Sequence, residues 1–282
     1  MAEIGAAGSA LTVAEHGPGQ GGPPSGHGPW RPLRLALALA RIDARGVGRD
    51  PLLRWLIGYP LALALIMRWG VPAIAGPILA RWGVSILDYG VLLTSFMVEL
   101  LPVLIGMIVG FLLLDERDDG TLLALQVTPL TLGGYLAYRV TLPIVASVIM
   151  TMVTVPLVGL VPVTFGPLLV IALGAAPLAP LFALFLAAFA RNKVEGFALT
   201  KASGVLFVPP VAAYFVAPPW QWAFGVFPTF WPVKAFWEQQ GVGSAASGPA
   251  VSEPIVLVAI GIVVQAGLVW LLLRRFSKVM SA

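Results

Sequence analysis

Hydrophobic residues dominate six long stretches of the chain, which polar or proline-rich segments separate. A helix that crosses the hydrocarbon core of a bilayer needs about 20 mostly apolar residues. The stretches that meet this length predict spans at 52–71, 90–114, 135–161, 167–190, 199–217 and 255–273. Prolines inside some of them, such as Pro102 and Pro156, kink a helix but are tolerated where neighbours satisfy the freed backbone groups. The pattern therefore predicts an all-α, polytopic membrane protein with six transmembrane helices.

The N-terminal region shows two different patterns. Residues 1–28 are rich in Gly and Pro and have no apolar period, so we expect a disordered cytoplasmic tail ahead of a transmembrane domain over 29–282. Residues 31–50 predict an amphipathic helix in the membrane interface, with arginines on one face and apolar residues on another. The alternative is a plain cytoplasmic extension of the first span. The two faces are Arg31, Arg34, Arg41 and Arg45 against Leu35, Leu39 and Ile42.

Composition and charge agree with a membrane protein and give it an orientation. The chain is 59% hydrophobic and 11% charged, whereas a soluble domain carries about 25% charged residues. With the N-terminus inside, all but three of its 17 Lys and Arg residues fall on the cytoplasmic side, the exceptions being Arg68, Arg81 and Lys234. This bias predicts cytoplasmic termini, and it explains the net charge of +4 without a nucleic-acid partner. The chain has no cysteine, so it forms no disulfide.

The stretch "DERDDGTLLALQVTPL", residues 115–130, is unusual because acids outnumber bases in a predicted cytoplasmic loop. Anionic headgroups would repel these acids, which indicates a partner other than the membrane surface. Gly120 is expected to end the preceding helix, residues 121–127 can form two helical turns, and Pro129 forces a turn before the third span. We therefore expect a short helix parallel to the membrane. A solvated loop with an ordinary helix cap is the alternative.

A family resemblance rests on this stretch and the residues that follow it. The pattern Glu116-Arg117-x-x-Gly120-Thr121-Leu122, then Thr128-Pro129-Leu130, Tyr135-Leu136 and Arg139, resembles the loop between spans two and three of type-2 ATP-binding-cassette (ABC) transporter permeases. In that family the loop carries a coupling helix that docks on an ATPase subunit. The resemblance extends over about residues 30–280, although the acidic pair at 118–119 departs from the family's mixed charge. It implies the following ATPase-coupling residues: Glu116, Arg117, Gly120, Thr121, Leu122, Leu125, Thr128 and Pro129.

The resemblance also implies a function and partners. The chain contains no G-x-x-x-x-G-K-[ST] phosphate loop, so ATP and Mg are expected on a separate ATPase subunit and no enzyme activity is expected here. The expected protein is the permease subunit of an exporter in the cell (cytoplasmic) membrane. It is expected to pair with a second, identical or different, permease chain. The oily spans suggest a small hydrophobic or amphipathic cargo.

Two further features are candidates for the transport pathway. Glu99 is the lone carboxylate inside a predicted span. It either lines the pathway or the dimer seam, where it favours a cationic or hydrogen-bonding cargo, or it is a protonated structural acid bonded to a neighbouring helix. Residues 218–237 are rich in Trp, Phe and Pro, and the resemblance implies an external re-entrant segment, with a simple aromatic belt as the alternative. The residues assigned to the re-entrant segment are Trp220, Trp222, Phe227 and Trp231.

Other functional classes have less support in the sequence. No set of membrane-embedded His, Cys or carboxylate residues is present to bind a metal or perform acid–base chemistry. An ion-coupled secondary carrier uses several intramembrane polar residues around broken helices, whereas Glu99 is expected to stand nearly alone. A non-transporting membrane scaffold is a third possibility. The basic loop at 190–201 is expected to be an orientation signal, with a minor ATPase contact as the alternative.

Overall fold

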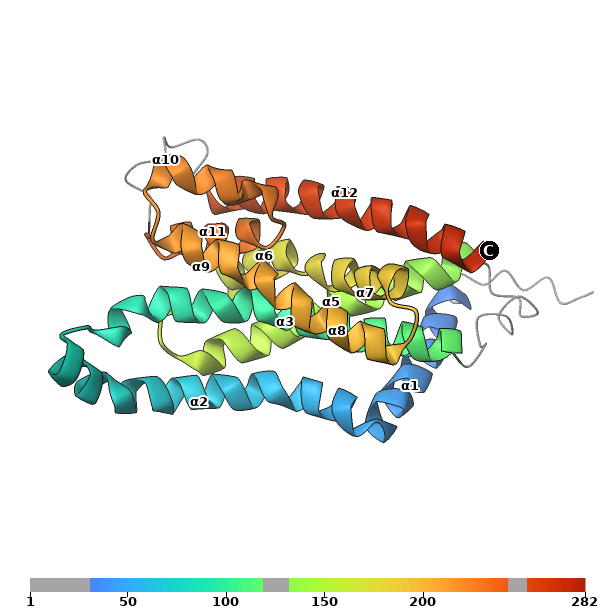
Figure 1. The fold of residues 1–282 in the computed structure, drawn as a ribbon, viewed down its shortest axis with the longest axis horizontal. Helices are drawn as coiled ribbons and strands as arrows, with labels where there is room; N and C mark the ends of the chain where they lie inside the picture. Colours follow the sequence, from blue (N-terminus) through green and yellow to red (C-terminus); the bar gives the residue numbers. More distant parts are fainter. Residues whose placement is uncertain (1–30, 119–131, 243–252, 282) are drawn as a thin grey trace, which may run out of the picture.

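The protein is a bundle of helices that lie side by side along one axis (Figure 1). The computed structural model describes residues 31–118, 132–242 and 253–281, and every regular element in these ranges is helical. Six helical segments are long and apolar enough to cross a membrane: Pro51–Trp82, Ile86–Asp118, Gly133–Val158, Phe165–Phe189, Lys193–Tyr214 and Pro254–Phe276. Each overlaps one predicted span, which confirms the all-α polytopic fold.

The first two helices meet at Asp50. Helix α1 (Arg31–Arg49) ends there, and α2 (Pro51–Trp82) begins at the next residue. The Asp50 carboxylate caps α2 by accepting a hydrogen bond from the Leu52 N–H at 2.8 Å, as a helix N-cap residue does. Helix α2 ends at Gly83, whose φ of 68° is left-handed backbone that favours glycine. The predicted first span stopped at residue 71, but α2 continues to Trp82 with Pro72 and Pro77 inside it.

Helix α3 (Gly90–Asp118) lies at the centre of the bundle. A short helix, η1 (Ile86–Tyr89), precedes it, and α5 (Leu132–Val158) and α7 (Leu178–Phe189) pack against it. A Cβ atom on Gly106 would overlap the Ala179 carbonyl oxygen and lie 2.8 Å from the Phe182 Cβ. The backbones of α3 and α7 are therefore so close that only glycine fits between them.

Spans four and five are each assembled from shorter helices. Span four consists of α6 (Phe165–Ala175) and α7, with Pro177 at the break. Span five consists of α8 (Lys193–Ser203), η2 (Gly204–Phe207) and α9 (Val208–Tyr214). Span six is the continuous helix α12 (Pro254–Ser281). Neither span four nor span five is therefore one continuous α-helix.

The proline-rich segment after span five forms three short helices, α10 (Pro218–Gln221), η3 (Trp222–Val226) and α11 (Phe230–Gln239). Helix α11 packs against α3, α6 and α12, so the segment folds back against the spans (Figure 1). Ahead of α11, the Thr229 hydroxyl donates to the Leu206 carbonyl at 3.0 Å, inside the η2 break of span five. This arrangement agrees with a re-entrant segment.

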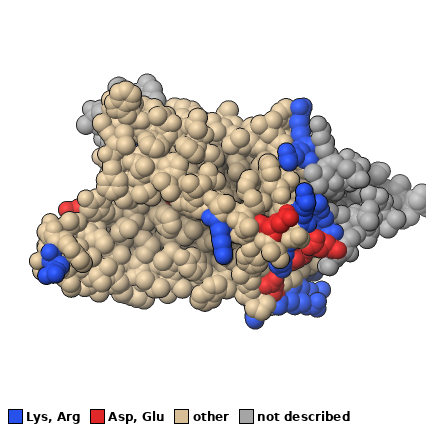
Figure 2. Space-filling view, viewed as in Figure 1, with Lys and Arg blue, Asp and Glu red and all other residues tan. Residues whose placement is uncertain are grey.

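Charged side chains gather at the end of the bundle where α1 and the C-terminal part of α12 lie (Figure 2). We call this the charged end, and the end that carries η1 the opposite end. The surface between them is almost free of charge in this view. The exposed apolar residues of the spans include Trp55, Trp69 and Ile149, as expected for lipid contact. The predicted tail at 1–28 and the predicted coupling helix lie outside the described residues.

The two ends of the bundle can be placed relative to the membrane by cysteine labelling, since the chain has no native cysteine. Asp88, in η1, and Asp118, at the end of α3, are both exposed. We expect a membrane-impermeant maleimide to label Asp88→Cys on intact cells and to label Asp118→Cys only after the membrane is opened. Equal labelling of both variants on intact cells would contradict the six-span topology.

The close approach of α3 and α7 predicts a stability effect. Gly106→Ala forces a methyl group against the Ala179 backbone, and overpacking of this kind costs about 1–3 kcal/mol. Gly58→Ala is the matched control, because a Cβ at this position of α2 meets nothing within 4 Å. Thermal unfolding in detergent should show a lower midpoint for Gly106→Ala alone. Equal midpoints for the two variants would refute the close packing.

Candidate functional site

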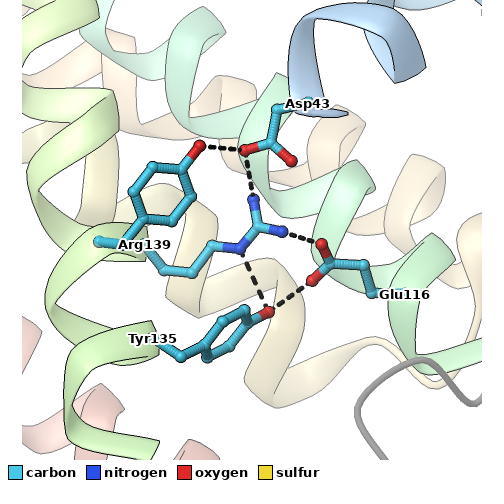
Figure 3. A network of polar contacts seen from close by, with 5 residues as sticks. Asp43, Glu116, Tyr135 and Arg139 are labelled. Atoms are coloured by element: carbon cyan, nitrogen blue, oxygen red, sulfur yellow. Dashed lines mark hydrogen bonds and ion pairs between the residues drawn. The ribbon is translucent and has the colours of Figure 1, made fainter. Parts of the chain in front are cut away.

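A buried arginine joins three helices at the charged end (Figure 3). Arg139 of α5 is 2% exposed, and its Nη1 lies 3.0 Å from the Asp43 carboxylate of α1. Its Nη2 forms a second ion pair with the Glu116 carboxylate of α3, and its Nε donates to the Tyr135 hydroxyl at 3.1 Å. These residues and Tyr138 form what we call the Arg139 cluster.

The two tyrosines complete the bonding of the Arg139 cluster. The Tyr138 hydroxyl donates to Asp43 at 2.6 Å, and the Tyr135 hydroxyl donates to Glu116. Tyr135, Tyr138 and Arg139 share one face of α5 because residues three and four apart are neighbours on a helix. The guanidinium carbon also lies 5.3 Å from the ring centroid of Tyr135 and 5.6 Å from that of Tyr138. All three nitrogens of the guanidinium have a partner, which a buried charge requires.

A second cluster at the charged end is more accessible to solvent. Lys193 is the first residue of α8, and its ammonium lies 2.8 Å from the Asp50 carboxylate and 3.0 Å from the Asp115 carboxylate. The hydrogen bond from Lys193 lowers the pKa of Asp50 below its usual value. Because the folded-state pKa is the lower one, stability from this bond is present above the usual pKa of Asp and lost as pH falls through the lowered value. These three residues form the Lys193 cluster.

The predicted basic loop at 190–201 is mostly helical. Helix α8 begins at Lys193, and the Asn192 side chain caps it by accepting from the Glu195 N–H at 3.0 Å. The Glu195 carboxylate in turn accepts from the Arg191 N–H at 2.8 Å. Span five therefore starts before the predicted boundary at 199, because a good N-cap follows the preceding span directly.

The predicted coupling residues fall into two groups. Glu116 belongs to the Arg139 cluster, and Arg117 Nη1 donates to the Ala190 carbonyl at 3.3 Å. Gly120, Thr121, Leu122, Leu125, Thr128 and Pro129 lie outside the described residues. The residues on both sides of segment 119–131 are nevertheless bonded to one another, since Glu116 contacts both Tyr135 and Arg139. The two ends of the segment are thereby held together.

The predicted pathway residues lie in the other half of the bundle. Glu99 is 1% exposed within the single chain, so its side chain does not face a dimer surface in this conformation. Trp222 and Trp231 are half-buried with ring centroids 6.4 Å apart, and Phe227 is also half-buried. Trp220 is 74% exposed. The aromatic segment thus has one exposed ring and several that pack into the protein.

Sequence reasoning missed a buried ion pair in α11. Lys234 was counted among the residues outside the membrane, but its side chain is 1% exposed and its ammonium lies 2.6 Å from the Glu238 carboxylate. Gln265 of α12 is also fully buried. Among the described residues, Glu99 thus shares the protein interior with a buried ion pair and a buried glutamine. The spacing of Lys234 and Glu238, four residues apart on one helix, was the signal available in the sequence.

Comparisons with known proteins connect this architecture to one family. The family model described as "Fluoroquinolones export permease protein Rv2686c-like" matches residues 43–273, a range that contains both charged clusters. Two curated proteins of Mycobacterium tuberculosis, from strains CDC 1551 / Oshkosh and ATCC 25618 / H37Rv, are each named "Fluoroquinolones export permease protein". Each is 32% identical over 246 residues, covering 86% of this chain and 94% of the relative. No solved structure matches.

The two clusters predict different responses to loss of their cation. Arg139→Met leaves two carboxylates without a counter-ion at a buried site, and breaking such a pair costs about 3–5 kcal/mol. Lys193→Met acts at a partly exposed site and should cost less than about 1 kcal/mol. Unfolding in detergent measures both, and adding Asp43→Asn and Glu116→Gln to Arg139→Met should recover stability. Similar losses for the two single variants would contradict the assigned burial.

Proposed function

The chain belongs to the family of Rv2686c-like fluoroquinolones export permease proteins, and on this premise we propose that it is the membrane half of an ABC exporter. A separate ATPase subunit binds ATP and Mg and hydrolyses the nucleotide. This chain forms the pathway through the membrane and converts the movement of the ATPase into a movement of its spans. No covalent step takes place in this chain.

The observation that carries the proposal is the bonding of Glu116 to Tyr135 and Arg139. These residues flank segment 119–131, to which the sequence assigns the coupling helix. A force applied to that segment reaches α3 and α5 together, because the ion pair ties the end of one helix to the start of the other. Asp43 extends the same connection to α1. The charged end therefore has the connectivity that a coupling device needs.

The proposed assembly has two permease chains and two ATPase subunits in the cell membrane, with both termini of this chain in the cytoplasm. The charged end faces the ATPases, in agreement with the excess of Lys and Arg on cytoplasmic segments. The exposed Asp118 faces the ATPase rather than the anionic lipid surface, whereas Asp115 and Glu116 pair with basic residues of this chain. Membrane lipid covers the exposed apolar side chains of α2, α5 and α12.

The proposed cargo is a small amphipathic compound of the fluoroquinolone class. The relatives' names motivate this choice, and the apolar spans with a few buried polar residues suit a molecule that combines aromatic rings with charged groups. An ion-coupled carrier is the second candidate, because Glu99, Lys234 and Gln265 are buried among broken helices. Dependence of export on ATP hydrolysis by a co-purified ATPase separates the two functions.

The coupling role predicts that one substitution in segment 119–131 prevents the ATPase subunit from binding. If Leu125 fits an apolar pocket of the ATPase, Leu125→Arg buries an unpaired charge there and costs several kcal/mol, enough to weaken docking more than about a hundredfold. Ala44→Arg is the control, since it adds the same charge at an exposed position of α1. We expect normal expression of both variants and loss of ATPase co-purification and drug export for Leu125→Arg only. Retained docking and export would remove the coupling assignment.

A further inference from the structure

A hydrogen bond fixes how α3 and α11 lie against one another. Trp237 Nε1 donates to Ser95 Oγ at 3.0 Å, and both side chains are buried. Helix α11 runs from the interior toward the opposite end, because Thr229 ahead of it contacts η2 whereas Gln240 after it donates to the Pro162 carbonyl at 3.1 Å. Helix α3 runs the other way.

One turn deeper than this hydrogen bond, each helix carries a buried charged residue. Glu99 is four residues beyond Ser95 on α3, and Lys234 is three residues before Trp237 on α11. Both residues are therefore on nearly the same face as the contact above them and at a similar depth in the bundle. Their side chains are each 1% exposed.

The end of α6 and the middle of α12 reach the same layer. Gly106 of α3 packs on Ala179, and α3 and span four run in the same direction, so Glu99 is level with the end of α6. There Gln265 Nε2 donates to the Gly174 carbonyl at 3.1 Å and also lies 3.3 Å from the Pro228 carbonyl. We call the set Glu99, Lys234, Glu238 and Gln265 the buried polar layer.

The two acids of the buried polar layer differ in their partners. Lys234 and Glu238 form an ion pair and neutralise one another, whereas Glu99 forms no ion pair with any residue in the described ranges. The Glu99 Oε2 and Gln265 Oε1 atoms are buried and have no hydrogen-bond partner among those residues. An ionised carboxylate in a membrane interior requires a partner. Glu238 Oε2 is also buried without a hydrogen-bond partner there, so the layer has three free acceptors, and Glu99 is the acid that lacks a counter-ion.

We propose that the buried polar layer binds the protonated amine of an amphipathic cargo, with the Glu99 carboxylate as its counter-ion. This inference rests on the proposed export function and specifies a cargo that carries an ammonium group. A positively charged group gives the Glu99 carboxylate a counter-ion, whereas an anionic group in the same place would be repelled by it. The ion pair of Lys234 and Glu238 holds α11 over the site, so cargo enters when α11 separates from α3.

Direct binding to the purified permease, without an ATPase, tests the site. The probes are a fluoroquinolone with a free piperazine amine, which is protonated at neutral pH, and its N-acetyl analogue, in which that nitrogen is an uncharged amide and the ring carboxylate is unchanged. We expect the wild type to bind the amine more tightly. Glu99→Gln should bind the amine about tenfold more weakly while its affinity for the acetyl analogue stays unchanged, because only the amine loses a charged hydrogen bond.

Two control variants test whether the change in binding is specific to the carboxylate of Glu99. Glu253→Gln makes the same chemical change at an exposed position before α12 and should behave as wild type, and Glu99→Asp should keep part of the preference for the amine. A Glu99→Gln protein that retains the full preference would overturn the site. Equal wild-type binding of the two probes would also overturn it while leaving export intact. Failure of the wild type to bind either probe would instead reject the proposed cargo class.

Discussion

The guanidinium of Arg139 is the contact on which the organisation of the charged end depends. A buried cation needs anionic partners, and Asp43 and Glu116 need the cation equally, so each group is stable only while the others stay in place. The three residues come from α1, α3 and α5. The Lys193 cluster adds the start of α8 to the same end. Helices that are distant in sequence are thereby connected beside segment 119–131, where the ATPase is proposed to act.

Helix α3 joins this end to the buried polar layer. Glu116 and Glu99 both belong to this helix and lie between four and five turns apart along it. Between them, Gly106 and Gly110 bring α3 close to α7, so that the two helices have little room to slide independently. The ion pairs at one end and the tight packing along the length make α3 suited to transmit a displacement. Several buried polar atoms in the layer around Glu99 have no hydrogen-bond partner among the described residues, which suits a region that opens and closes during transport.

The sequence was most informative about the spans and least informative about their contacts. Six apolar stretches predicted six helical segments correctly because length and hydropathy are local properties. The end of α2 was missed because prolines that end helices in water are tolerated within a membrane. Arg139 was recognised as part of a family motif, but its bond to Asp43 joins residues 96 positions apart and has no local signal. Lys234 was assigned to an external segment from the order of the spans alone, which gives no indication that it is buried and paired with Glu238.

The central claim is that α1, the end of α3 and the start of α5 move as one body around Arg139. Spin labels at Ala44 on α1 and Ala137 on α5, both exposed in a chain without cysteine, report on this by pulsed electron paramagnetic resonance. We predict one narrow distance distribution that is unchanged when the assembled exporter binds a non-hydrolysable ATP analogue, and a broad distribution in Arg139→Met. A distance between α1 and α5 that shifts with nucleotide in the wild type would contradict the account.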